Sequence, residues 1–332
     1  MRIHLQSHPS GGNFPLTPEQ WDVAAARAPD VSGGHAVSFG DTPEAFAAAI
    51  GEAEIVITQT AAAAELFPAP ALFPAAAPRL RLIYVTSAGL EKLAPFTWLP
   101  DGVQLLNNRG AHAAKAGEYG IMALLMLANR MPAFATAQRE GRWAQQHGAV
   151  LAGREVVVVG LGTLGGSTAE HAARFGMRVI GVRTRAEPHP ACTRVVATSE
   201  LDRVLPDAEF LVLAPPLTGA TRNLLDRRRI ALLPQGAGVV NMGRGALLDQ
   251  DALLDALDAG RLSGAVLDVF VPEPIPPGHR LWTTPNLVIT PHMSADDPNT
   301  YNPRSLDIFF ENLRALREGR GLPNRFDVAR GY

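Results

Sequence analysis

Three side chains with complementary chemistry follow three predicted strands in the second half of the sequence. Arg244 lies in VVNMGRGALL, Glu273 in GAVLDVFVPEP and His292 in NLVITPH. An arginine can bind a carboxylate through two hydrogen bonds and polarise a carbonyl beside it. A histidine can donate a proton to the oxygen of that carbonyl, and a carboxylate can keep the histidine oriented and charged. Together these groups meet the requirements for reducing a 2-oxo acid.

Each of the three residues also has an ordinary interpretation. Arg244 can be one more surface arginine, since all basic residues except Lys92 and Lys115 are arginines. Glu273 can be a charged residue in a proline-rich turn, and His292 can be a loop histidine without chemistry. Their positions favour a functional role, because each follows the carboxyl end of a predicted strand, where open α/β sheets bind ligands.

A series of apolar runs predicts the sheet that positions these residues. EVVVVG is a nearly continuous β-branched run, typical of a strand buried on both faces of a parallel sheet. Further strands are predicted at RVIGV, EFLVLA, GVVNM, GAVLDV and NLVIT, with helices such as TAEHAARFG and DQDALLDALDAG between most of them. This alternation is typical of a doubly wound sheet.

The first hundred residues predict a second, smaller α/β sheet. AEIVITQ and LRLIYVTSAG are predicted strands and PEAFAAAI is a predicted helix. AAAAELFPAPALFPAAAP is expected to form a short helix followed by loops, because its prolines forbid one long helix. A buried helix is predicted over 112–131. A final amphipathic helix is predicted in TYNPRSLDIFFENLRALREG, with its apolar side formed by Leu306, Phe309, Phe310, Leu313 and Leu316.

A glycine-rich segment, GLGTLGG, directly follows the strand EVVVV and precedes a predicted helix. It places Gly160, Gly162 and Gly165 in the G-x-G-x-x-G spacing, with Thr163 and Leu164 in the same loop. The first glycine permits a tight turn, the second lets the backbone approach a pyrophosphate, and the third lets the helix pack on the strand. Backbone N–H groups at the start of the helix attract phosphate. The context favours dinucleotide binding over a plain glycine-rich turn.

Composition and charge narrow the class of protein. A chain of 332 residues predicts two domains, and a net charge of −2 disfavours nucleic acid or an anionic membrane as a partner. Cys192 is the only cysteine, so an intramolecular disulfide and a cysteine metal cage are both excluded. The N-terminal segment does not have the pattern of a secretory signal, and no apolar run reaches the roughly 18 residues that a membrane span needs. We therefore expect a cytoplasmic protein that is not bound to a membrane.

From about Leu80 onward, the sequence resembles the D-isomer-specific 2-hydroxyacid dehydrogenase family. The matching pieces occur in the family's order and at similar spacings, and include TSAGLEKL, NNRGAHAAKAGEYG, VVGLGTLGGSTAEHAARFGMRV, LAPPLTGATRNLL, VVNMGRGALLDQDALLDAL, GAVLDVFVPEP, LWTTPNLVITPH and FFENLRALREGRGLPN. The resemblance implies two doubly wound parallel-sheet α/β domains. A Rossmann cofactor domain, residues 106–298, is inserted into a smaller flavodoxin-like substrate domain, residues 1–105 plus 299–332.

The resemblance also implies roles for individual residues in a cleft between the two domains. Arg244 would bind the carboxylate and carbonyl oxygen of the substrate, and His292, hydrogen-bonded to Glu273, would act as acid or base. Hydride would pass directly between the substrate and a nicotinamide ring, so that no metal is required. The substrate carboxylate would also be cradled by backbone amides of Ser87, Ala88 and Gly89.

Other positions would contact the cofactor. Asp268 would meet the nicotinamide carboxamide, while Pro215 and Pro216 would line the cofactor groove, with Thr221 later in the same loop. Asn241 and Met242 would shape the wall next to the arginine. Each of these residues also has a purely structural interpretation.

The strand RVIGVRTR ends in Arg183, Thr184 and Arg185. Arg183 is 18 residues beyond Gly165, close to where NAD-preferring folds place an acidic residue against the ribose 2′-hydroxyl. Two arginines and a threonine suit a 2′-phosphate instead. We therefore predict that NADP(H) is preferred and that NAD(H) is possible. The alternative is a pair of solvated arginines at a strand end.

Substrate and assembly are expectations from the resemblance. Glyoxylate and hydroxypyruvate are the favoured substrates, and formate is disfavoured because formate-oxidising relatives usually have glutamine at the position of Glu273. The chain ends at Tyr332 without an additional regulatory domain, which counts against a phosphoglycerate dehydrogenase without excluding one. A dinucleotide-sensing, corepressor-like binding protein is a further alternative, since such relatives retain the same three residues. A homodimer is expected, built partly through the segment with Arg142 and Trp143.

Overall fold

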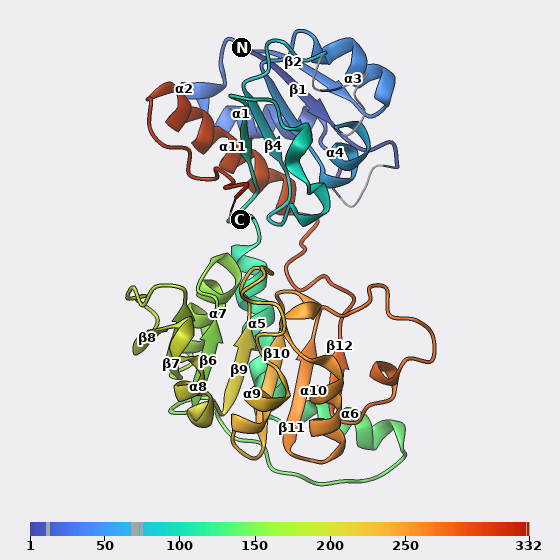
Figure 1. The fold of residues 1–332 in the computed structure, drawn as a ribbon, viewed down its shortest axis with the longest axis vertical. Coiled ribbons are helices and arrows are strands. Elements are labelled where there is room, and N and C mark those ends of the chain that lie inside the picture. Colours follow the sequence, from blue (N-terminus) through green and yellow to red (C-terminus); the bar gives the residue numbers. More distant parts are fainter. Residues whose placement is uncertain (11–13, 68–72, 74–75, 330, 332) are drawn as a thin grey trace. The chain divides into compact units, whose positions relative to one another are not determined.

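The structure is a computed structural model that describes residues 1–10, 14–67, 73, 76–329 and 331. Two compact units are present, Met1–Ala111 with Asp297–Tyr332 and His112–Asp296 (Figure 1). Each contains one parallel sheet with helices on its faces, so the predicted α/β class with two doubly wound sheets is confirmed. The two units divide after residues 111 and 296, whereas the sequence analysis expected boundaries after residues 105 and 298.

The first unit has a five-stranded parallel sheet in the order β2-β1-β3-β4-β5, the flavodoxin-like order. Its strands are β1 (Arg2–Gln6), β2 (Ala36–Gly40), β3 (Ile55–Thr58), β4 (Leu82–Val85) and β5 (Gln104–Leu106). Its helices are α1 (Pro18–Arg27), α2 (Pro29–Ser32), α3 (Pro43–Ile50), α4 (Thr60–Leu66) and α11 (Tyr301–Arg317), with short 3-10 turns at Glu91–Leu93 and Phe96–Trp98.

Apolar side chains cover both faces of this sheet. Helices α3 and α4 pack on one face, and α1 and α11 pack on the other. The predicted apolar side of the last helix is confirmed, because Phe309 and Phe310 are buried against Trp21 of α1. Capping explains where α1 begins: the side chain of Thr17 accepts a hydrogen bond from the amide of Gln20. The helix α11, distant in sequence, thus completes the core of the first unit.

The second unit has a seven-stranded parallel sheet in the order β12-β11-β10-β9-β6-β7-β8 (Figure 1). Its strands are β6 (Glu155–Val159), β7 (Arg178–Arg183), β8 (Arg194–Ala197), β9 (Phe210–Leu213), β10 (Ala237–Asn241), β11 (Leu262–Leu267) and β12 (Leu287–Ile289). Its helices are α5 (Ala113–Ala128), α6 (Met131–Arg139), α7 (Thr163–Arg174), α8 (Leu201–Val204), α9 (Arg227–Leu232) and α10 (Gln250–Asp258), with 3-10 turns at Thr198–Glu200, Leu205–Asp207, Gly245–Leu247 and Arg280–Trp282.

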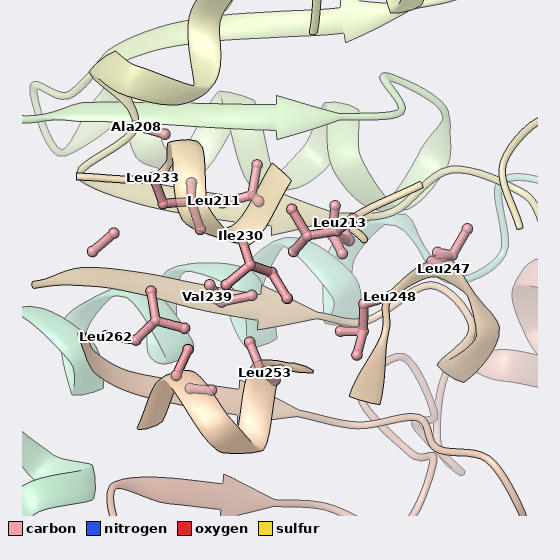
Figure 2. Packing of buried hydrophobic residues seen from close by; sticks show 14 of the residues in the cluster. Ala208, Leu211, Leu213, Ile230, Leu233, Val239, Leu247, Leu248, Leu253 and Leu262 are labelled. Carbon is pink, nitrogen blue, oxygen red and sulfur yellow. The ribbon is translucent and has the colours of Figure 1, made fainter. Parts of the chain in front are cut away.

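Helices cover both faces of the second sheet as well. Helices α5 and α7 pack on one face, and α8, α9 and α10 pack on the other. Figure 2 shows Ile230 of α9, Leu253 of α10 and Val239 of β10 in the apolar cluster on the face covered by α8, α9 and α10. Helix α10 begins directly after Asp249, whose side chain accepts a hydrogen bond from the amide of Ala252. Burial on both faces explains the continuous apolar runs of the strands.

Local differences from the sequence-based expectations are limited. The helix expected over 112–131 ends at Ala128, and a new helix, α6, starts after Arg130, which has the left-handed φ of 58°. Pro132, in the first turn of α6, suits a helix start and not a helix interior. The short helix expected near the alanine-rich segment is α4, whereas part of the loop expected after it, 68–72 and 74–75, lies outside the described residues.

Within the described residues, no single helix has both the length and the apolar composition of a membrane span. The bent pair formed by α5 and α6, at 66° to each other, meets both criteria when the two helices are combined. Helix α5 packs into the core of the second unit. Over the same described residues, no group of three or more His, Cys, Asp or Glu side chains is arranged to hold a metal ion.

Candidate active site

The carboxyl ends of six adjacent strands of the second sheet lie in register. Residues paired across the sheet form one row, which runs Ile289, Leu267, Asn241, Leu213, Val159 and Val182. Arg244, Glu273 and His292 all follow this row, as do the glycine-rich segment and Arg183. The sheet therefore brings the residues that the sequence analysis placed in the second unit to one edge.

His292 and Glu273 form a hydrogen-bonded pair at this edge. Nδ1 of His292 lies 2.7 Å from Oε2 of Glu273. Because an ionised carboxylate only accepts hydrogen bonds, Nδ1 carries the proton and donates it. The other oxygen of Glu273, Oε1, accepts the backbone N–H of Phe270 at 2.8 Å. Glu273 is therefore fixed by the main chain, and it orients the imidazole with the second ring nitrogen, Nε2, left for other partners.

Arg244 lies on a turn directly after β10. The side-chain amide of Asn241 donates to the carbonyl of Arg244 at 3.0 Å, and its oxygen accepts the N–H of Gly243 at 3.2 Å. A Cβ on Gly245 would lie 2.2 Å from the carbonyl carbon of Phe270, so only glycine fits there. Phe270 is the residue whose amide binds the glutamate of the pair. The arginine turn and the glutamate turn are thus in direct backbone contact.

The glycine-rich segment forms the turn between β6 and α7, and its geometry fits a dinucleotide. Gly160 has a φ of 89°, which favours glycine. A Cβ on Gly165 would lie 1.9 Å from the carbonyl oxygen of Gly160, so α7 packs against the turn only with glycine at that position. A Cβ on Gly162 would meet nothing within 4 Å, so open space lies beside the first turn of α7. Thr163 and Leu164 begin the helix, where free N–H groups attract phosphate.

The segment after β9 lies against the same turn. A Cβ on Gly160 would be 2.5 Å from the nitrogen of Pro215, so this segment and the glycine-rich turn touch. The hydroxyl of Thr221 donates to the carbonyl of Pro216 at 2.6 Å and accepts the amide of Thr218 at 2.7 Å. Thr221 therefore shapes the loop that carries the two prolines.

The two arginines at the end of β7 share a partner that the sequence analysis did not identify. Arg183 lies 3.5 Å from Glu187 and Arg185 lies 3.8 Å from the same carboxylate. The side chain of Arg183 is 36% exposed and that of Arg185 is 75% exposed. An anion that binds both guanidinium groups has to compete with Glu187. Because Arg183 ends a strand and is not part of a helix, the four-residue spacing to Glu187 did not indicate this pairing in the sequence.

Asp268 is fully buried directly after β11, and its carboxylate is used inside the protein. Oδ1 accepts the hydroxyl of Thr290 at 2.5 Å and the amide of Met293 at 3.0 Å, and Oδ2 accepts the amide of Ser294 at 2.9 Å. These donors come from the segment that carries His292. The expected contact of Asp268 with a nicotinamide carboxamide stays a prediction.

The expected substrate loop lies in the first unit, after β4. The amide of Ser87 donates to the carbonyl of Val85 at 2.8 Å, and its hydroxyl donates to the carbonyl of Gly89 at 2.9 Å. Asn107 donates to the carbonyl of Ala88 at 3.0 Å. The amide of Ser87 is therefore used within the loop, and the expected cradle for the substrate carboxylate stays a prediction.

The chain is similar to known 2-hydroxyacid dehydrogenases. Residues 121–294 match the model of the D-isomer specific 2-hydroxyacid dehydrogenase NAD binding domain. D-3-phosphoglycerate dehydrogenase of Mycobacterium tuberculosis is 29% identical over 286 residues, which are 86% of this chain and 53% of that protein. Glyoxylate reductase of Korarchaeum cryptofilum is 29% identical over 255 residues, 75% of this chain and 76% of that protein. The chain thus spans about half the length of the phosphoglycerate dehydrogenases that it matches.

Solved structures are similar over the whole chain. A D-isomer specific 2-hydroxyacid dehydrogenase from Xanthobacter autotrophicus, solved with NADPH and MES, has a TM-score of 0.80 at 29% identity and covers 99% of both chains. A probable 2-hydroxyacid dehydrogenase from Rhizobium etli, solved with NADP, HEPES and L(+)-tartaric acid, has a TM-score of 0.77 at 25% identity and covers 100% of both chains.

Proposed function

Because the chain belongs to the D-isomer specific 2-hydroxyacid dehydrogenase family, a family of NAD(P)-dependent oxidoreductases, we propose that it reduces a small 2-oxo acid to the D-2-hydroxy acid. Glyoxylate and hydroxypyruvate are the favoured substrates. The observation that carries the proposal is the 2.7 Å contact of His292 with Glu273 on a turn that touches the turn of Arg244. A cation, an acid and an orienting carboxylate are the groups that this reduction requires.

The proposed mechanism assigns each of the three residues one task. Arg244 holds the substrate carboxylate and polarises the carbonyl through its guanidinium group. A bound reduced nicotinamide supplies the hydride that the carbonyl carbon takes up. His292 gives the proton at Nε2 to the carbonyl oxygen, which becomes the hydroxyl. Glu273 stabilises the imidazolium before the transfer and keeps Nδ1 turned away from the substrate.

We further propose that the cofactor lies along the glycine-rich turn, with NADP(H) preferred over NAD(H). The open space beside Gly162 and the N-terminus of α7 support a pyrophosphate there. Arg183, Thr184 and Arg185 suit a 2′-phosphate because two guanidinium groups and a hydroxyl can all donate to it. Glu187 opposes this preference, since its carboxylate occupies the same two arginines.

A second candidate activity is oxidation of 3-phosphoglycerate. The similarity to phosphoglycerate dehydrogenases, over 86% of this chain, favours it. It would use the same three residues in the reverse direction.

One set of assays tests these proposals. The purified protein is mixed with NADPH or NADH and, in turn, with glyoxylate, hydroxypyruvate, pyruvate, phenylpyruvate and longer 2-oxo acids. Loss of absorbance of the reduced cofactor and chiral analysis of the product report reduction to the D-isomer. Oxidation of 3-phosphoglycerate is measured with NAD⁺ and NADP⁺. A protein that binds the cofactor but turns over none of these acids would favour the corepressor-like alternative.

We also propose that two copies form a homodimer through the segment between α6 and β6, and that the protein works in the cytoplasm. Trp143 in that segment is 92% exposed in the single chain, and tryptophan is enriched among the residues that contribute most to protein interfaces. Light scattering of the wild type and of Trp143→Ala tests the assembly. A monomeric wild type at micromolar concentration would refute it.

A further inference from the structure

A chain of hydrogen bonds leads from helix α5 to the turn that carries His292. The hydroxyl of Tyr119 lies 2.8 Å from that of Thr290, which in turn donates to Oδ1 of Asp268 at 2.5 Å. Because Thr290 has a single hydroxyl proton and gives it to the carboxylate, Tyr119 is the donor in the first bond. Burial raises the pKa of Tyr119 to about 12, so its hydroxyl remains a donor at neutral pH.

The hydrogen-bond donors to the Asp268 carboxylate lie on both sides of His292 in the sequence. Thr290 precedes the histidine, while the amides of Met293 and Ser294, which also donate to this carboxylate, follow it. The backbone of His292 is held as well, since its amide donates to the carbonyl of Asp268 at 2.9 Å. Every bond of this set joins the end of β11 to the segment after β12.

The conformation of His292 needs such support. Its φ of 53° lies in the left-handed region, which residues other than glycine rarely adopt. Unfavourable backbone conformations persist only where the surroundings hold them. In this conformation Nδ1 of His292 reaches Glu273. A relaxed backbone would swing the imidazole away from the carboxylate and displace the proton on Nε2.

We propose that Tyr119 and Thr290 are positioning residues, which act through Asp268 to hold the left-handed turn of His292 against Glu273. The inference rests on the proposed function, because it assigns proton transfer to His292. The hydroxyls of Tyr119 and Thr290 act through Asp268, and only the backbone carbonyl of Thr290 contacts His292, by accepting its amide at 3.0 Å. Their effect is therefore expected in kcat, with the affinity for cofactor unchanged.

Four variants test the proposal. Thr290→Val removes the hydroxyl at constant shape, Thr290→Ser retains it, and Tyr119→Phe removes the outer donor. Thr136→Val is the matched control, because the hydroxyl of Thr136 binds the amide of Asn286 at 2.8 Å at the amino end of β12. For each variant, kcat, KM for the 2-oxo acid, the Kd for NADPH and the melting temperature are measured.

The expected pattern follows from the bonds that are lost. Thr290→Val is expected to lower kcat about tenfold, since a hydrogen bond to a charged group is lost, and Tyr119→Phe about threefold, since a neutral bond is lost. The Kd for NADPH should stay within about twofold in both variants. Thr290→Ser should recover most of the activity. Thr136→Val should lower only the melting temperature.

Two results would overturn the inference. One is that Thr290→Val and Tyr119→Phe keep the wild-type kcat and lose only melting temperature, as the control does. The other concerns hydrogen exchange in the substrate-free protein. The amides of Met293 and Ser294 are expected to exchange faster in Thr290→Val than in Thr136→Val. Equal exchange in these two variants would refute the positioning role, even if the wild type turned over none of the 2-oxo acids.

Discussion

The preference for NADPH over NADH is expected to depend on three charged residues after β7. Arg183, at the strand end, is about one-third exposed, Arg185 is mostly exposed, and Glu187 lies within 3.5 and 3.8 Å of them. Replacing each residue separately changes one charge next to the proposed 2′-phosphate position. NADH has no 2′-phosphate. A change in kcat/KM measured with NADH therefore reports effects of the substitution that do not involve this phosphate.

The magnitudes follow from exposure. A hydrogen bond to a charged group contributes about 1.5 to 3 kcal/mol, so Arg183→Ala should reduce the NADPH to NADH ratio of kcat/KM by about tenfold or more. For the more exposed Arg185, solvent screening limits an ion pair to about 1 kcal/mol, which gives up to about fivefold. Glu187→Gln removes the competing carboxylate, whose side chain is 57% exposed. This substitution should raise the NADPH to NADH ratio of kcat/KM by about two- to fivefold.

The assay compares kcat/KM for both cofactors in the wild type, the three single variants and Arg183→Ala/Arg185→Ala. Arg178→Ala is the matched control, because Arg178 begins the same strand, is 57% exposed and pairs with Glu155 at 3.5 Å. Its cofactor ratio should equal that of the wild type. A wild type that prefers NADH, or a double variant with an unchanged ratio, would refute the assignment of these arginines.

Three further predictions concern the candidate site. His292→Asn should lower kcat about 10²-fold or more, while NADPH titration shows nearly unchanged affinity, and near-normal turnover would remove His292 from the mechanism. Arg244→Ala should weaken binding of 2-oxo acids and of oxamate, measured by inhibition; if only the melting temperature fell, Arg244 would be structural. Gly162→Ala should keep the melting temperature but weaken NADPH binding, whereas Gly165→Ala should lower both, since its Cβ would meet the carbonyl oxygen of Gly160 at 1.9 Å. Equal behaviour of the two glycine variants in calorimetry and fluorescence titration would contradict this reading of the turn.

Much of the fold was predictable because burial leaves a strong pattern in the sequence. The β-branched run EVVVVG is indeed β6, and the apolar spacing of the last helix is that of α11. Strands β1, β2, β5 and β8 were not predicted. Strand β5 has only three residues, and β2 and β8 are short edge strands without a buried apolar run. Helix α6 was missed because its sequence continues from α5 without a composition change, and the break depends on Arg130 and Pro132.

The candidate site was predictable where residue type and strand position agree, as they do for Arg244, Glu273 and His292. The contacts that Tyr119 and Glu187 make around this site could not be predicted, because they depend on how the chain folds in three dimensions. Tyr119 lies on the buried side of α5 among apolar residues, so its hydroxyl looks incidental in the sequence. The pairing of Glu187 with two arginines depends on the turn after β7, whose shape no spacing rule gives.

The interrupted first unit has a consequence for how the protein is made. Its sheet comes from the first 106 residues, but α11 comes from residues 301–317. On the ribosome, every strand and helix of the second unit is therefore synthesised before α11. Until that helix emerges, Leu5, Ile57 and Tyr84 have no Phe309 or Phe310 to pack against. Because α1 covers only part of this face, the first residues to leave the tunnel expose some apolar surface for most of translation, and exposed surface of this kind is what chaperones of nascent chains bind.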